Sequence, residues 1–405
     1  MKQQRILTAL NDIDDNFVTE AVTPLPKMHR TYFKFAAVAV ASLIAVFGLW
    51  YFNHLSQNAP DPGPDNNHNA NTEYVNGLKV LPLPDSVQTG SMGYEGYCVY
   101  RYDELKLGNP WNPDIVINTM PVYQYIEQDV QSDNGKTIAE AYFEKKAARE
   151  EVEALLRQRL VGFDNAVVEV PLGYNISQYS ATVYFDPPET VPDSYNTDVL
   201  ATYEETKVLG EYLLANYGQI LGMKKPAVAV YGGGYGNYED GLKNTYYTRF
   251  YDADGDIVQQ IFSYSNELGA RICVTEKSEV EVAQVHEGVN ISLIYNGNYK
   301  SLGDYPIQTY DQALQKLYSG GYFDNILPDD MVITKDLIAA VELIYVTDRY
   351  NTRTIMPYYK FYVENTSYQS MGGVEGMKQL IPCYIPALLD KYYTNLPQVN
   401  GIPFN

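Results

Sequence analysis

The segment YDADGDIVQQIF places Asp252, Asp254 and Asp256 at alternating positions, as at the start of a calcium-binding loop. An EF-hand loop also requires glycine at its sixth position and a bidentate glutamate at its twelfth. Those positions hold Ile257 and Ser263, and the flanking residues are typical of strands. We therefore expect the turn of a β-hairpin at Asp254-Gly255, with a weak cation site as the alternative.

The glycine-rich segment YGGGYGNYEDG (231–241) follows a predicted strand, as phosphate-binding loops do. It lacks the Gly-Lys-Ser/Thr ending, and no clear helix follows to direct a dipole at a phosphate. Glu239 and Asp240 would repel an anion. We expect a loop between strands that could still shape a binding surface.

His286, in AQVHEGVN, is the one histidine beyond residue 68, and it stands beside Glu287. Acid–base or triad catalysis needs an identifiable partner within reach, and none is evident in the sequence. The nucleophile and metalloprotease signatures GxSxG, SxxK and HExxH do not occur. Acidic pairs such as Glu150–Glu151 and Asp329–Asp330 are typical of solvent-facing surfaces. We expect no enzyme, catalytic residue, metal ligand or cofactor, although a carboxylate pair from distant segments would be invisible here.

Three cysteines, Cys98, Cys273 and Cys383, are widely spaced and form neither a CxxC motif nor a Cys/His cluster. We expect buried or partly buried thiols rather than a disulfide framework or a zinc site. The net charge is −21, and residues 1–55 hold 5 Lys/Arg against 4 Asp/Glu, so the acidity lies in the remainder. An acidic surface repels polyanions, so nucleic acid is not an expected partner.

The opening segment ILTALNDIDDNFVTEA (6–21) has the pattern of an amphipathic helix. Its apolar residues follow i, i+4, i+7, i+11 spacing and would line one face: Ile6, Leu10, Ile13 and Phe17. A helix of about 15 residues is marginal alone in water, so it needs a partner. Because three aspartates occupy the polar side, we expect a groove on a cytoplasmic protein rather than an anionic membrane surface. Juxtamembrane packing, disorder and lipid binding are the alternatives.

Residues 32–52, YFKFAAVAVASLIAVFGLWYF, form the one long apolar run. At 1.5 Å per residue they would span about 31 Å, which matches a hydrocarbon core of about 30 Å. Lys27, Arg30 and Lys34 lie at or before its start, and no Lys or Arg follows until Lys79. The positive-inside rule therefore places the N-terminus in the cytoplasm and residues from about 56 onward outside.

The remaining sequence predicts an α+β fold in which helices pack on antiparallel sheets. Helices are expected at 136–160, 198–221 and 309–323, each followed by strands rich in Tyr, Val and Ile. The predicted organisation is a cytoplasmic head (1–30), a transmembrane helix (31–55), a flexible stalk (56–75) and three tandem α+β units (76–195, 196–300 and 301–405). The 37 tyrosines beyond residue 55 fit half-buried sheet faces, with a Tyr-lined glycan or protein surface as the alternative.

Residues 305–390 contain DQALQKLYSGGYF, VELIYVTDRYNTRTIMPYYKFYVE and CYIPAL. This stretch resembles the helix–strand–strand modules of PepSY-like and YycH/YycI-like extracytoplasmic domains. The resemblance implies a protein with one N-terminal anchor that regulates a membrane histidine kinase by contact and catalyses nothing. The opening segment resembles the cytoplasmic heads of uncharacterised Gram-positive single-pass proteins, some of which are anti-sigma factors. The zinc-binding anti-sigma type is excluded, because no cysteine precedes Cys98.

These observations favour a single-pass extracytoplasmic sensor or regulator located in the cell membrane. It would act by protein–protein contact on a sigma factor, a kinase or another cytoplasmic or membrane signalling partner. One alternative is an anchored cell-surface binding or adhesion module in which the head sets topology alone. A third is an anchored hydrolase, which would need a cleft with convergent carboxylates.

Overall fold

The computed structural model describes residues 73–83, 86–87, 97–125, 138–170, 178–198, 200–238, 241–265, 270–275, 286–296, 299–323, 327–328, 331–346, 354–367, 376–396 and 398–399. Over these residues the predicted α+β class is confirmed, with strands that pair mostly antiparallel. No helix within these ranges is long and apolar enough to cross a membrane. The predicted span 32–52 lies outside them, as do the head (1–30) and nearly all of the stalk (56–75).

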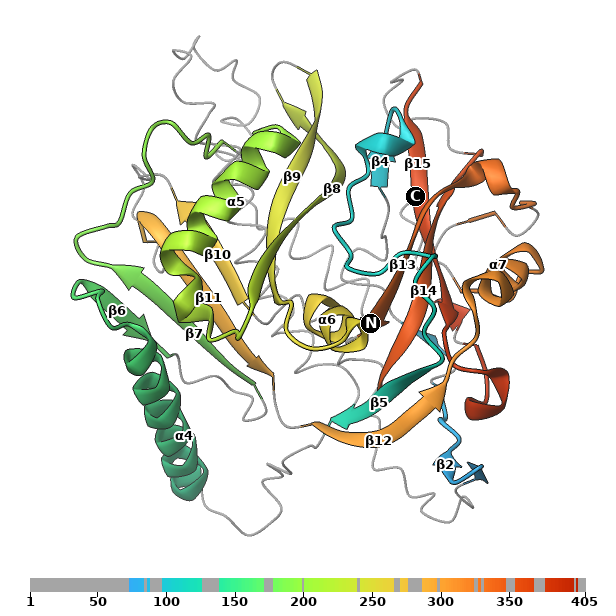
Figure 1. Cartoon of the computed structure of the whole chain (residues 1–405), viewed down its shortest axis with the longest axis horizontal. Coiled ribbons are helices and arrows are strands. Elements are labelled where there is room, and N and C mark those ends of the chain that lie inside the picture. The colour runs from blue at the N-terminus through green and yellow to red at the C-terminus, as the bar shows by residue number, and fades with distance from the viewer. Residues whose placement is uncertain are drawn as a thin grey trace, which may run out of the picture. The chain divides into compact units, whose positions relative to one another are not determined.

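The larger sheet has six strands in the order β12-β5-β14-β15-β4, with β13 also paired to β14 (Figure 1). Its strands are β4 (Tyr97–Val99), β5 (Thr119–Tyr125), β12 (Tyr299–Pro306), β13 (Ile338–Val346), β14 (Thr354–Glu364) and β15 (Lys378–Pro386). The central strand β14 is buried on both faces, from Ile355 to Val363. One face carries the apolar core, which includes Leu343, Phe361 and Ile381. The other face carries a smaller apolar cluster that includes Val99 and Leu380, together with the polar and charged side chains described below.

The second sheet has four strands in the order β10-β11-β7-β6. They are β6 (Ala166–Glu169), β7 (Gln178–Phe185), β10 (Ala270–Thr275) and β11 (Gly288–Asn296). The core here combines strand residues such as Val183 and Ile291 with Leu156 of α4 (Ile138–Arg159) and Leu213 of α5 (Tyr203–Tyr217). Helix α4 lies along β6 and β7 (Figure 1).

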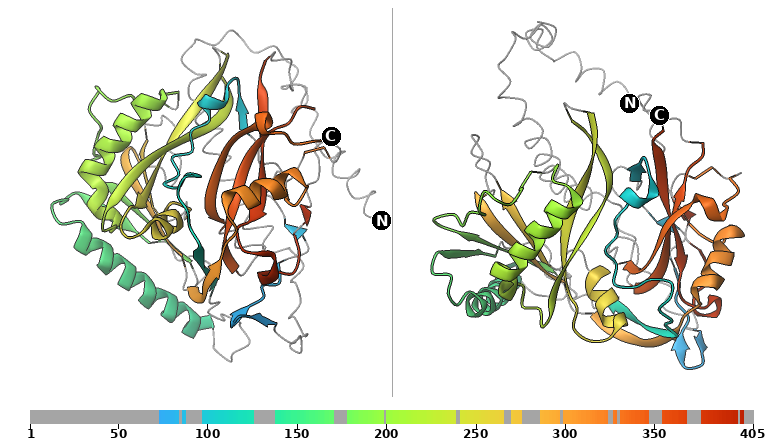
Figure 2. Two further views of the ribbon diagram at one scale, coloured as in Figure 1. Left: turned by 45° about the vertical axis from the view of Figure 1, so that its right-hand side comes forward. Right: turned by 45° about the horizontal axis from the view of Figure 1, so that its top comes forward.

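The long hairpin of β8 (Pro226–Tyr238) and β9 (Gly241–Asp252) corrects the loop expected at 231–241. Backbone pairing continues through the glycines to Tyr238↔Gly241, with a register shift between Gly232 and Gly234. A strand that carries several glycines gives little sequence signal, because glycine has no side chain to form an alternating pattern. Helix α5 contacts both strands of this hairpin, as two further views show (Figure 2).

The hairpin expected at Asp254-Gly255 is also wrong, because β9 leads through that turn into helix α6 (Ile257–Ser265). The helix begins with a capping box in which Asp256 Oδ1 accepts the N–H of Gln259 at 2.9 Å and Gln259 Oε1 accepts the N–H of Asp256 at 3.0 Å. Ile261 and Tyr264 are its buried apolar residues. Reciprocal capping and i, i+3 burial are helix features.

The three predicted helices are confirmed as α4, α5 and α7 (Tyr310–Tyr318). Capping boxes begin α5, at Thr202 and Glu205, and α7, at Thr309 and Gln312. The shorter elements are β1 (Tyr74–Val75), β2 (Leu78–Lys79), β3 (Ser86–Val87), β16 (Gln398–Val399) and the 3₁₀ turns η1 (Tyr102–Glu104), η2 (Gly218–Leu221), η3 (Lys335–Leu337) and η4 (Asp390–Tyr392).

The sheets do not follow the three ranges predicted as tandem units. The six-stranded sheet joins β4 and β5, from the range 76–195, with β13, β14 and β15, from the range 301–405. Its sixth strand, β12, begins two residues before that range. The four-stranded sheet joins β6 and β7 with β10 and β11, which belong to the range 196–300. Pairing between distant strands leaves no periodic mark in a single sequence, because it depends on register rather than on local composition.

Candidate functional site

The predicted partner-binding residues Ile6, Leu10, Ile13 and Phe17 lie outside the described residues. The structure therefore bears on the remaining candidates of the sequence, which are the aspartate triplet, the isolated histidine, the acidic pairs and the cysteines.

The aspartates of the calcium-like segment serve the backbone. Asp252 accepts the N–H groups of Lys225 at 2.9 Å, Lys224 at 3.0 Å and Asp254 at 3.1 Å. Partial burial by itself raises the pKa of Asp252, but these hydrogen bonds and the Lys224 charge outweigh it and lower the pKa below 3.8. Asp256 caps α6 instead of facing Asp252. Within the described ranges, no group of three or more His, Cys, Asp or Glu side chains is arranged to hold a metal ion.

His286 lies just before β11, and its neighbours come from two other strands of the four-stranded sheet. Its ring stacks on Tyr184 of β7, with centroids 3.4 Å apart and an interplanar angle of 4°. Its Nε2 lies 3.6 Å from Glu169 Oε2 at the end of β6. The Tyr184 hydroxyl lies 3.4 Å from the other Glu169 oxygen. Sequence reasoning could not identify these partners, because β6 and β7 precede His286 by about 100 residues or more.

The acidic pair Glu150–Glu151 is solvent-exposed on α4, as predicted, whereas Asp329–Asp330 is outside the described residues. All three cysteines are described and none is in a disulfide bond, so the prediction of thiols is confirmed. Cys383 is fully buried, and Cys98 and Cys273 are partly buried.

A cluster that the sequence reasoning missed lies on the polar face of the six-stranded sheet. Glu342 of β13 and Lys360 of β14 are directly opposite each other, and both are buried, with 5% and 7% of their surface exposed. The Tyr362 hydroxyl donates to Glu342 Oε2 at 2.6 Å. Tyr264 of α6 donates to the Leu107 carbonyl and lies 3.3 Å from Glu342 Oε1. We call Glu342, Lys360, Tyr362 and Tyr264 the buried polar cluster.

Aromatic rings surround the cation of this cluster. Lys360 Nζ lies 5.1 Å from the ring centroid of Tyr362, 5.4 Å from that of Tyr384 and 5.5 Å from that of Tyr97. It also lies 3.4 Å from the Tyr97 hydroxyl. Aromatic faces attract a desolvated ammonium group, which offsets part of the cost of its burial. Burial and then the Glu342 charge raise the pKa of Tyr362 well above 10, so its hydroxyl remains a donor.

The cluster links segments that are distant in the sequence. Asn109 Nδ2 lies 3.4 Å from Glu342 Oε1 and donates to the Leu343 carbonyl at 3.2 Å. Tyr345 N–H donates to the Ser265 hydroxyl at 2.9 Å, so α6 also covers the edge of β13. Glu342 thus accepts donors from α6, from β14 and from the segment before β5, and these hydrogen bonds hold the segments together.

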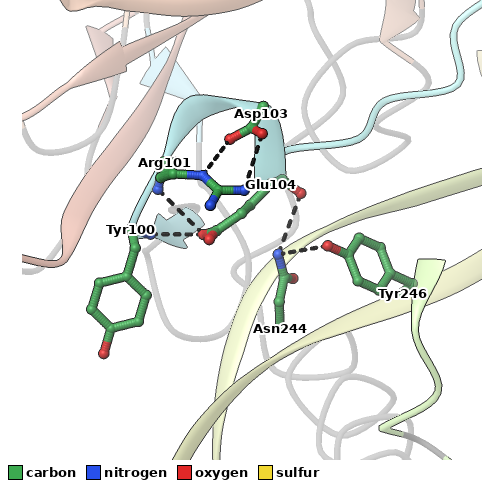
Figure 3. Close-up of polar contacts among 6 residues, drawn as sticks. All are labelled: Tyr100, Arg101, Asp103, Glu104, Asn244 and Tyr246. Atoms are coloured by element: carbon green, nitrogen blue, oxygen red, sulfur yellow. Dashed lines mark hydrogen bonds and ion pairs between the residues drawn. The ribbon is translucent and has the colours of Figure 1, made fainter.

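A second polar junction lies where η1 meets the long hairpin (Figure 3). Asn244 of β9 donates to the Glu104 carbonyl at 3.3 Å and lies 3.3 Å from the Tyr246 hydroxyl. Arg101 forms a bidentate pair with Asp103 at 2.9 and 3.1 Å, and these two side chains are 71% and 66% exposed. Exposed pairs of this kind contribute at most about 1 kcal/mol to stability.

The sequence did carry a signal for the buried polar cluster. Each of the segments AAVELIYV and TIMPYYKFYV contains a single charged residue among apolar ones. A charge in the middle of a buried strand must be paired, so the two charges predict each other.

No protein-family model and no curated protein matches this chain. Among solved structures, it is similar to the crystal structure at 1.45 Å resolution of an uncharacterized protein from Eubacterium rectale ATCC 33656. The sequence identity is 12%, the match covers 69% of this chain and 86% of that chain, and the TM-score is 0.26.

Proposed function

We propose that this protein is a single-pass membrane regulator whose α+β part lies outside the cell. Residues 32–52 anchor it, and the helix at 6–21 contacts a cytoplasmic or membrane signalling protein. The observation that carries the proposal is the spacing of Ile6, Leu10, Ile13 and Phe17 ahead of an apolar run with basic residues on its N-terminal side. Four apolar residues on one helix face need a partner surface to cover them. A segment that only sets the membrane topology would not need such a face.

The described part supports a role in binding better than a role in catalysis. Its most buried charged groups, Glu342 and Lys360, are used by the fold, and the Asp252 carboxylate binds backbone N–H groups. The resemblance of residues 305–390 to PepSY-like and YycH/YycI-like domains points the same way. The partner class is a sigma factor or a membrane histidine kinase.

The test is an in-cell crosslinking pulldown with the full chain. The double variant Leu10→Asp/Phe17→Asp places two charges on the apolar face. The matched control Thr8→Asp/Asn11→Asp places the same two charges on the opposite side of the same helix, at 100° per residue. We expect the intact chain and the control to recover a signalling protein that the Leu10/Phe17 variant loses. Recovery of the same partners by all three forms, with none of them cytoplasmic, would leave an anchored binding or adhesion module and end the regulator proposal.

A further inference from the structure

Residues 73–83 are the first described segment, and along the chain they lead back to the predicted span 32–52. We call residues 73–83 the N-terminal strap. Its strands β1 and β2 form a separate two-stranded sheet with two residues in each strand. An isolated two-stranded ribbon is marginally stable in water, so the strap depends on the groups that it packs against.

The strap is docked at one end and exposed at the other. Leu81 and Leu83 are buried in the core of the six-stranded sheet. The Tyr305 hydroxyl of β12 donates to the Lys79 carbonyl at 2.9 Å. Tyr74, at the end that leads toward residues 32–52, is 63% exposed. A movement that passes along the chain from the predicted span therefore meets the fold at Lys79 and Leu81.

The backbone of the docked end is bound by a segment from the other end of the sequence. The Leu81 N–H donates to the Tyr392 carbonyl at 2.8 Å, and the Thr394 N–H donates to the Leu81 carbonyl at 3.1 Å. These two hydrogen bonds pair Leu81 in parallel with Tyr393. Both hydrogen-bonding groups of the Leu81 backbone are thus used by residues 392–394.

The same register continues further along both segments. Ser86 pairs with Gln398 and Val87 pairs with Val399, in the parallel two-stranded sheet of β3 and β16. The difference in residue number is the same in these two pairs as in the pair at Leu81. We call residues 392–394 and 398–399 the clasp, because they bind the strap and the strand that follows it in one parallel register.

The clasp is firmly placed at its start and weakly held beyond it. Tyr392 is buried, and its ring packs edge-on against Tyr305 with centroids 5.5 Å apart. Thr394 is exposed, and β16 has two residues. Parallel pairs are slightly less stable per residue than antiparallel ones, and short units exposed to solvent open at a lower free energy than a core. Opening of the clasp therefore requires no rearrangement of the buried sheet residues.

We propose that the clasp is a releasable contact that holds the N-terminal strap on the fold, and that its opening frees the strap while the two large sheets stay folded. A partner that binds residues 392–399 outside the membrane would then change the connection to residues 32–52. That regulatory role rests on the proposed function, whereas the clasp itself rests on the contacts described above.

The test is limited trypsin digestion of the full chain in mild detergent. Lys79 is the first Lys or Arg after Lys34, so a cut after Lys79 gives a fragment that begins at Val80 and is identified by mass spectrometry. Cleavage there needs the strap to leave the fold, because Lys79 lies in β2 and its carbonyl is bound by Tyr305.

The variant is Thr394→Pro, which deletes the N–H that donates to Leu81. Tyr393 already has the extended backbone that the residue before a proline adopts, with φ −143° and ψ 159°. The matched control Thr394→Ala removes the side chain and keeps the N–H. Far-UV circular dichroism and thermal melts follow the folding of the two large sheets in each form.

We expect Thr394→Pro to be cut after Lys79 at least about 5-fold faster than the wild type, since loss of a backbone hydrogen bond shifts a local opening equilibrium by about that factor. Thr394→Ala should be cut at the wild-type rate. Equal rates in all three forms would overturn the proposal. Global unfolding of Thr394→Pro would overturn it as well, because the strap would then open only with the whole fold. The crosslinking pulldown reports on the cytoplasmic contact alone, so failure of the clasp and failure of the regulator proposal give different results.

Discussion

Removal of one hydroxyl from the buried polar cluster isolates the energy of a charged hydrogen bond inside the sheet. The Tyr362→Phe variant keeps the ring that faces Lys360 and deletes the donor that lies 2.6 Å from Glu342 Oε2. The Glu342 carboxylate then keeps the Tyr264 hydroxyl at 3.3 Å and Asn109 Nδ2 at 3.4 Å, both near Oε1. No cavity larger than one oxygen atom is created, so packing contributes little.

The expected loss follows from the charge of the acceptor. Hydrogen bonds to charged groups contribute about 1.5–3 kcal/mol, against about 0.5–1.5 kcal/mol for neutral pairs. Tyr359 on the same strand supplies the neutral comparison, because its buried hydroxyl donates to the Gln308 carbonyl at 2.9 Å. Tyr362→Phe should therefore lower the free energy of unfolding by about 1 kcal/mol more than Tyr359→Phe does.

The assay is equilibrium urea unfolding of the full chain and the two variants, followed by far-UV circular dichroism. A double-mutant cycle of Tyr362→Phe with Glu342→Gln then measures the coupling directly. Equal losses for the two tyrosine variants, or a coupling energy near zero, would refute the assignment of Glu342 as a charged acceptor. The cluster would then be held by packing of its rings.

Three further predictions concern other parts of the fold. Gly210→Ala should lower the unfolding free energy by about 1–2 kcal/mol although alanine favours a helix, because the new Cβ would meet a Thr248 methyl group at 2.8 Å. As a control, Ala215→Gly on the exposed side of the same helix should lower the unfolding free energy by about 1 kcal/mol. Equal stability of Gly210→Ala and the wild type would contradict the close approach of Thr248 to Gly210. Asp252→Asn should lower the unfolding free energy at neutral pH, and the difference from the wild type should vanish as the pH falls through the lowered pKa of Asp252. The reason is that a carboxylate with a lowered pKa stabilises the fold above pH 3.8 and no longer does so once it is protonated. Urea unfolding at several pH values measures this difference. Cys383 should resist thiol reagents until the protein unfolds, and rapid native labelling there would place it outside the core.

Local patterns in the sequence were enough to place three helices and the main strands after them. The periodic segments at 136–160, 198–221 and 309–323 became α4, α5 and α7, because amphipathic spacing and capping residues act within a few residues. Segments with the Tyr, Val and Ile content of strands, such as TIMPYYKFYVE, became strands as well. The α+β fold class follows from these helices and strands.

Helix α6 shows where a competing local signal was overlooked. Ile257 and Val258 are β-branched, and together with the preceding strand they suggested a returning strand. The capping box at Asp256 and Gln259 and the spacing of Ile257, Ile261 and Tyr264 favour a helix instead. The aspartates therefore do not form a hairpin turn: Asp252 ends β9 and Asp256 caps α6.

The buried polar cluster depends on information that no single segment carries. Glu342 alone and Lys360 alone each read as a charge that weakens a strand prediction. They become compatible with burial once β13 and β14 pair so that the two residues face each other, and a shift by one residue would place each against an apolar partner. In this register Glu342 accepts the Tyr362 hydroxyl and Lys360 lies among three tyrosine rings, which offsets part of the cost of burying the two charges. Tyr264 extends the same argument to α6, because its approach to Glu342 requires the helix that follows the Asp252 turn to lie against β13.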